Sequence, residues 1–189
     1  MKTKGILKVF IVMLALVFLM LPVVSAASLV EKRQHIRDIS ETTLLKLYSL
    51  QPNARRYVEN AAGYGVFGNW GVKLLFIGGG TGKGMVVKNS NNFETYMDMV
   101  AGTIGFGIGA KTYNIVFIFE TEKALNDFTE NGWQFGGQVT AAATDSVSGD
   151  SYQGAFSVAP GVWMYEMTDK GLAIEITLKG AKFSKNDLN

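Results

Sequence analysis

The segment that decides the fold is GTIGFGIGAKTYNIVFIFE, residues 102–120. Within it, residues 104–110 alternate glycine with larger apolar residues, and at the two-residue period of a strand these glycines share one face. Glycine weakens a strand, so a face without side chains indicates that another element approaches closely or that the sheet coils sharply. Residues 114–119 follow as a strand that is apolar throughout after Asn114. The segment therefore predicts a curved and tightly packed sheet.

The residues on either side extend this sheet. Between Gly63 and Gly109 the chain has 13 glycines in 47 residues, interrupted by short apolar runs. Downstream, Thr121 is a suitable cap for a helix that runs to about Glu130, and Gly132 is a suitable end for it. Further strands are predicted at residues 133–142, 154–158, 161–167 and 172–179, with a polar hairpin loop at 144–151.

Two helices are predicted before the sheet. Ser28 and Glu31 form a capping box, and apolar residues then recur at helical spacing to about Leu50. Pro52 suits the first turn of a second, short helix, and Gly63 suits its end. The predicted class is α+β: a curved, barrel-like antiparallel sheet with N-terminal helices and one inserted helix. Residues 27–189 are expected to form a single domain, helical over 27–62 and glycine-rich sheet over 63–189.

Residues 1–26 have the pattern of a secretory signal peptide. Three lysines precede an apolar run of 16 residues, 9–24, and small residues end it at Ala26. A membrane-spanning helix needs about 20 apolar residues, so cleavage after Ala26 is expected rather than a permanent anchor. The protein is then expected to be exported, to the periplasm or the exterior.

Composition excludes several classes of function. The chain has no cysteine and a single histidine, His35, so disulfides, thiolate nucleophiles and multi-histidine metal sites are excluded. Without the three leader lysines, 15 Lys and Arg residues face 16 Asp and Glu residues, which does not suit a nucleic-acid binder. No cofactor or metal is expected.

The sequence features that could indicate an enzyme do not support catalysis. Residues 78–84 resemble a phosphate-binding loop, but Ile77 and Gly84 stand where that motif needs glycine and a hydroxyl residue. A turned hairpin with Lys83 exposed at its tip is predicted there instead. Glu166 and Glu175 fall in adjacent predicted strands and are expected to face outward. We therefore expect a protein without catalytic activity.

Binding is the remaining class of function, and basic residues are the candidates for it. Arginine forks pair well with phosphate oxygens, and an amphipathic helix can lie at a lipid headgroup boundary. Two arginine pairs lie on the predicted helices, and two lysines flank the glycine-rich hairpin. The candidate lipid-binding residues are Arg33, Arg37, Arg55, Arg56, Lys83 and Lys88.

Several of these segments, in this order and spacing, resemble the SYLF domain family. The matching stretches are residues 62–67, 82–86, 105–110, 121–128, 162–173 and 180–183, and the ending at 186–189 is similar to that of exported bacterial members. The resemblance implies a lipid-binding module, with basic positions matched here by Arg33, Arg37, Arg55 and Arg56. Gly68 follows Phe67 where the family usually has proline.

The family also includes eukaryotic members that bind phosphoinositides or act with actin, which an exported bacterial protein would not meet. The expected ligand is therefore an anionic phospholipid or another envelope amphiphile, bound peripherally at a membrane surface. An alternative is a structural protein of the cell envelope that docks a protein partner through its curved sheet. Binding through phosphate contacts should weaken steeply as ionic strength rises, whereas apolar docking should not.

Overall fold

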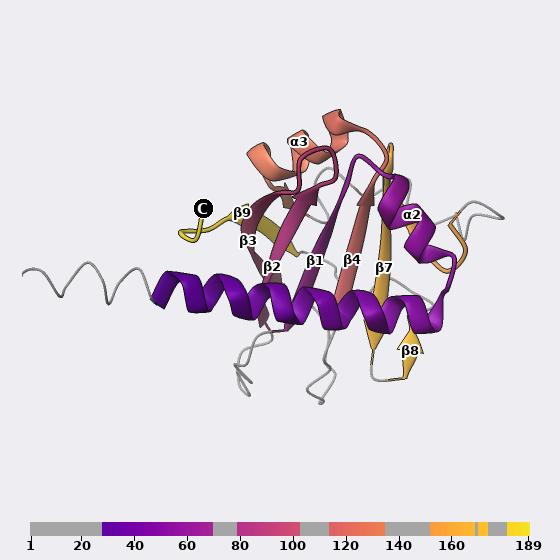
Figure 1. Ribbon diagram of the computed structural model, residues 1–189, viewed down its shortest axis with the longest axis horizontal. Coiled ribbons are helices and arrows are strands. Elements are labelled where there is room, and N and C mark those ends of the chain that lie inside the picture. Colours follow the sequence, from indigo (N-terminus) through magenta and orange to yellow (C-terminus); the bar gives the residue numbers. More distant parts are fainter. Residues whose placement is uncertain (1–27, 70–78, 103–113, 135–151, 169, 174–180) are drawn as a thin grey trace, which may run out of the picture. The chain divides into compact units, whose positions relative to one another are not determined.

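The computed structural model describes residues 28–69, 79–102, 114–134, 152–168, 170–173 and 181–189 (Figure 1). The chain divides into two compact units, residues 1–35 and 36–189, and the division lies within a stretch that is helical from 28 to 50. Residues 1–27, which include the predicted signal peptide, lie outside the described residues, as do an apolar run at 72–77 and the glycine alternation at 104–110. Among the helices that are described, none combines the length and apolar character needed to cross a membrane.

The second unit is built on one antiparallel sheet. After the helical stretch ending at residue 50, its elements are α2 (Ala54–Asn60), β1 (Gly63–Asn69), β2 (Gly79–Lys88), β3 (Phe93–Gly102), β4 (Asn114–Phe119), α3 (Glu122–Asn131), β5 (Trp133–Gln134), β6 (Phe156–Ala159), β7 (Val162–Thr168), β8 (Gly171–Leu172) and β9 (Lys182–Lys185). The strands are ordered β5-β9-β3-β2-β1-β4-β7-β6, with β8 paired to β7, and they form a curled half-barrel (Figure 1). The predicted α+β class, with an antiparallel curved sheet and an inserted helix, is confirmed.

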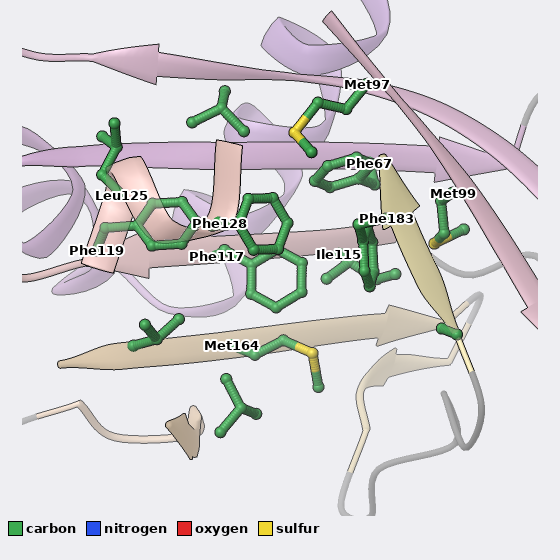
Figure 2. Close-up of a cluster of buried hydrophobic side chains, with 14 of the residues drawn as sticks. Phe67, Met97, Met99, Ile115, Phe117, Phe119, Leu125, Phe128, Met164 and Phe183 are labelled. Carbon is green, nitrogen blue, oxygen red and sulfur yellow. The ribbon is translucent and has the colours of Figure 1, made fainter. Parts of the chain in front are cut away.

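One face of this sheet is lined by aromatic side chains, and we call it the phenylalanine face. Rings from β1, β4, α3 and β9 meet there, and methionines from β3 and β7 surround them (Figure 2). The fully buried rings are Phe67, Phe117, Phe119, Phe128 and Phe183. Burying this much aromatic surface supplies much of the driving force for folding.

The opposite face, which we call the helix face, is covered by residues 36–50 and α2. Ile39 lies against β1, because a methyl group built on Gly68 would come within 2.9 Å of its side chain. Further along, the Lys46 amine donates a hydrogen bond to the Thr168 carbonyl of β7 at 3.0 Å. The helix therefore crosses several strands, and its buried residues Ile36, Ser40, Thr43 and Leu47 recur at helical spacing.

The inserted helix α3 begins and ends where its sequence predicts. The Thr121 side chain accepts a hydrogen bond from the Ala124 amide at 3.2 Å, which caps the first turn. Gly132 has a φ of 67° and its amide bonds to the Phe128 carbonyl, which ends the helix. These local signals act within a few residues and do not depend on the rest of the fold.

Two expectations about charged residues are wrong. Residues 79–84 belong to the continuous strand β2 rather than to a hairpin, so Lys83 is half-buried within the sheet and not at an exposed tip. Glu166 is fully buried rather than outward-facing. It lies opposite Ile115 in the β4–β7 register and shares the phenylalanine face with Met164. Glu175 lies outside the described residues.

Candidate functional site

Arg37 is held in an ion pair on the helix face. Its Nε and Nη2 atoms donate to the two carboxylate oxygens of Glu94 on β3, at 2.9 and 2.8 Å. The Tyr96 hydroxyl donates to the same carboxylate. The hydrogen bond to Glu94 is the main cause that raises the pKa of Arg37. The arginine fork that could bind a phosphate is thus occupied by a carboxylate of the same chain.

The two candidate lysines of β2 lie on opposite faces of the sheet. Lys83 points to the helix face, where its amine is 2.9 Å from the Asp98 carboxylate. Lys88 is 3.0 Å from Glu122 of α3. Because successive residues of a strand alternate between faces, an odd spacing of five positions separates these two amines across the sheet. They do not converge on one ligand.

Arg55 and Arg56 form a different arrangement, because both are exposed on α2. The Arg55 guanidinium carbon lies 4.4 Å from the ring centre of Tyr48, and that of Arg56 lies 5.5 Å from the ring centre of Tyr57. Arg55 also approaches Glu59 at 3.7 Å, an exposed pair of the kind that contributes little. A guanidinium that stacks by its flat face keeps its N–H edge available for an anion.

More aromatic rings continue from α2 to β7. Tyr57 and Tyr152 have ring centres 4.6 Å apart, and Tyr152 stacks on Trp163 at 4.6 Å with 17° between the ring planes. All three rings are partly exposed. We call this group the aromatic corner, and its members are Tyr48, Arg55, Arg56, Tyr57, Tyr152 and Trp163. Sequence analysis identified only the two arginines. Tyr48 and Tyr57 are near them in sequence, whereas Tyr152 and Trp163 come from a distant part of the chain.

The aromatic corner rests on packed elements. Gln51 lies just before α2, and its side-chain amide donates a hydrogen bond to the backbone carbonyl of Gln153 at 2.7 Å, which connects the two segments. Beneath them lies Tyr165 of β7, which is fully buried and whose hydroxyl has no hydrogen-bond partner among the described residues. Burial raises the pKa of Tyr165 well above its ordinary value. The rings are therefore held in a fixed arrangement on a rigid base.

The six predicted residues do not form one site. Arg33 belongs to the first unit, and the other five belong to the second. Arg37, Lys83 and Lys88 are each paired with a carboxylate from another element. Arg55 and Arg56, by contrast, are neighbours on the exposed side of α2, and each lies beside a partly exposed tyrosine ring.

The tyrosines of the aromatic corner make a prediction about alkaline stability. Burial, as the main cause, raises the pKa of Tyr48 to about 12, and burial together with a hydrogen bond to Glu120 raises that of Tyr152 to about 12. In the unfolded chain both ionise near pH 10. Between about pH 10 and pH 12 the unfolded state therefore loses protons that the folded state keeps, and stability falls as the pH rises.

Urea unfolding at a series of pH values measures this slope. A variant with Tyr48→Phe and Tyr152→Phe lacks the two phenols but keeps the rings, so its unfolding free energy should fall less over the same window. An equal slope in the variant and the parent would show that other groups, such as lysines, cause the loss.

Comparison with known proteins shows what the chain is similar to. Residues 100–189 match the family described as "Ysc84: Las17-binding protein actin regulator". The chain is also 28% identical over 153 residues to a protein named "Beta cell expansion factor A" from Aeromonas veronii. That alignment covers 81% of this chain, which spans only 57% of the relative's length. The predicted resemblance to the SYLF family is thereby confirmed, and residues 100–189 are the part of the chain that matches the SYLF (Ysc84) family.

Proposed function

We propose that this protein is an exported, non-catalytic module that binds anionic phospholipid headgroups at a membrane surface. The match of residues 100–189 to the SYLF family supports a binding module of the lipid-binding or actin-regulator-like kind, because that family consists of non-catalytic domains. The observation that carries the proposal is the pair Arg55 and Arg56, exposed side by side on α2 with their guanidinium groups over tyrosine rings.

The geometry of these arginines suits phosphate. Arginine presents its donors in a planar fork that matches two oxygens of a phosphate group, and contact with a ring does not use those donors. Ring contact also reduces the side-chain freedom that binding would otherwise remove. By contrast, Arg37 and Lys83 would have to give up Glu94 and Asp98 before they could bind a headgroup. This contrast supports α2 as the proposed lipid-binding surface.

Charge reversal on α2 tests this assignment. A variant with Arg55→Glu and Arg56→Glu should bind vesicles of phosphatidylglycerol and phosphatidylcholine at least about tenfold more weakly, since each basic residue near an anionic surface contributes about 1 kcal/mol. Co-sedimentation of residues 27–189, which include every described residue, measures the binding. The full chain is run in parallel, because an apolar leader could itself enter the bilayer.

A matched control separates location from net charge. Lys182 and Lys185 are exposed on β9, which is separated from β7 by β3, β2, β1 and β4. Replacing both by glutamate changes the net charge by the same amount but should leave binding nearly unchanged. Equal losses in the two variants would contradict an arginine site on α2, provided that circular dichroism shows both variants folded.

A second candidate function is an interaction protein that docks a protein partner through its curved sheet. The family description names a protein, Las17, as a ligand. Two apolar side chains on β3, Phe93 and Val100, are also 64% and 52% exposed. If wild-type protein fails to bind anionic vesicles, this alternative is preferred, and a variant with Phe93 and Val100 replaced by serine becomes the test of partner capture.

A further inference from the structure

The aromatic corner carries an inference that rests on the proposed function and goes beyond it. We propose that the corner is the surface with which the domain enters an anionic bilayer, with Tyr57, Tyr152 and Trp163 as anchors at the membrane interface. In this orientation Arg55 and Arg56 lie at the level of the headgroup phosphates. The proposal thus specifies which side of the domain meets the lipid. Two arginines alone would not specify this orientation.

The kinds of side chain at the corner suit this boundary. Tyrosine and tryptophan have an apolar body and a polar edge, and they concentrate where membrane hydrocarbon meets water. Tyr57, Tyr152 and Trp163 are each partly exposed, so each has apolar surface left to bury. Their contacts at 4.6 Å hold them in one continuous group, and an ordered group loses little freedom on binding.

Charge at the corner explains why the rings are needed. Arg55 and Arg56 are accompanied by two acids, Glu59 at 3.7 Å from Arg55 and Glu120 hydrogen-bonded to Tyr152. The two acids offset part of the attraction that an anionic surface exerts on the arginines. The arginines therefore supply preference for anionic lipid, and the rings supply a part of the affinity that salt does not screen.

Two other surfaces of the second unit suit an anionic membrane less well. The exposed side of α3 presents Glu122, Asp127 and Glu130. Two cations lie beside them, Lys123 and the Lys88 that pairs with Glu122, so an excess of acid remains and an anionic bilayer would repel this side. At the β3 end of the helix face, Arg37 and Lys83 are neutralised by acids of the same chain. Charge complementarity thus favours the aromatic corner over both of these surfaces.

The test places an environment-sensitive label at one position at a time, which is possible because the chain has no cysteine of its own. Single cysteines replace Asn53 and Gln153 beside the corner, and Ser90 and Glu130 elsewhere. All four positions are exposed and so accept a label. Each is labelled with a nitrobenzoxadiazole dye in the full chain and, in parallel, in residues 27–189.

Labelled protein is mixed with vesicles of phosphatidylglycerol and phosphatidylcholine, and the same samples are sedimented. The emission of labels at Asn53→Cys and Gln153→Cys should rise and shift to the blue as they enter the interface. Labels at Ser90→Cys and Glu130→Cys should not change. A Trp163→Ala variant should lose most of the binding that persists at high salt, while a Trp163→Phe variant should retain it.

The outcomes separate the two proposals. Sedimentation with the vesicles accompanied by shifts only at Ser90→Cys or Glu130→Cys would overturn the aromatic corner as the docking surface and leave lipid binding intact. Shifts at all four positions would likewise contradict docking by one corner. Failure to sediment with anionic vesicles would overturn lipid binding itself, and the orientation with it.

Discussion

Replacing Phe117 with alanine should lower the free energy of unfolding by about 3–5 kcal/mol, the range for truncating a buried aromatic ring. Phe117 is fully buried at the centre of the phenylalanine face (Figure 2). Its ring centre lies 5.2 Å from that of Phe128 and 5.3 Å from that of Phe183. Truncation removes ring contacts with β1, α3, β5 and β9 at once, and the packed sheet cannot collapse into the space.

Urea unfolding followed by circular dichroism measures this loss, and the chain provides a matched control. Phe93 on β3 is 64% exposed, so Phe93→Ala should change the unfolding free energy by no more than about 0.5 kcal/mol. Similar losses for the two substitutions would contradict the division between a buried aromatic cluster and an exposed strand end.

Gly84→Ala should be the other strongly destabilising change, with a loss of about 3 kcal/mol, at the upper end for inserting one carbon into a packed core. A methyl group at this position would lie 2.2 Å from the backbone carbonyl oxygen of Val66 and 2.4 Å from the Phe67 ring. The β1 backbone would have to move to admit it, and β1 pairs with both β2 and β4.

Gly65→Ala is the control for this glycine. Gly65 lies on the neighbouring strand, and a methyl group there would meet only side-chain atoms, the nearest at 3.3 Å. These atoms can shift by a few tenths of an ångström, so the expected loss is below about 1 kcal/mol. If Gly65→Ala proves as damaging as Gly84→Ala in the same urea unfolding assay, close backbone approach is not the reason that Gly84 lacks a side chain.

Local signals predicted the parts of the fold that depend on a few neighbouring residues. The cap at Thr121 and the end at Gly132 identify α3, and the apolar run at 114–119 identifies β4. Such signals need no knowledge of the rest of the chain, because their hydrogen bonds and burial patterns are complete within one element.

Strand β3 was not predicted. Both of its faces are covered in the folded chain, although one face carries apolar residues and the other carries acidic ones. Met97 and Met99 face the aromatic core, whereas Glu94 and Asp98 face the helix. Acidic residues under a helix resemble a solvated surface in sequence. Only the tertiary structure supplies the cations that pair with them. For the same reason Lys83 was predicted to be exposed although it is held by Asp98.

The candidate site was predictable only in part. Neighbouring arginines on a short helix are visible in the sequence, and Arg55 and Arg56 do lie on α2. The rings that extend the site are not, because Tyr152 and Trp163 are far from α2 in sequence and reach Tyr57 only in the folded chain. Which cations are consumed by internal ion pairs is likewise a property of the folded chain.

The most direct test of lipid binding compares wild-type protein on two kinds of vesicle, phosphatidylglycerol with phosphatidylcholine and phosphatidylcholine alone, at low and at moderate salt. We predict co-sedimentation with the anionic vesicles, weakened but not abolished at moderate salt, and little with the zwitterionic ones. Arginine contacts account for the preference for anionic vesicles, and the rings of the aromatic corner account for the binding that remains at moderate salt. Absence of binding to anionic vesicles at low salt would contradict the proposed function.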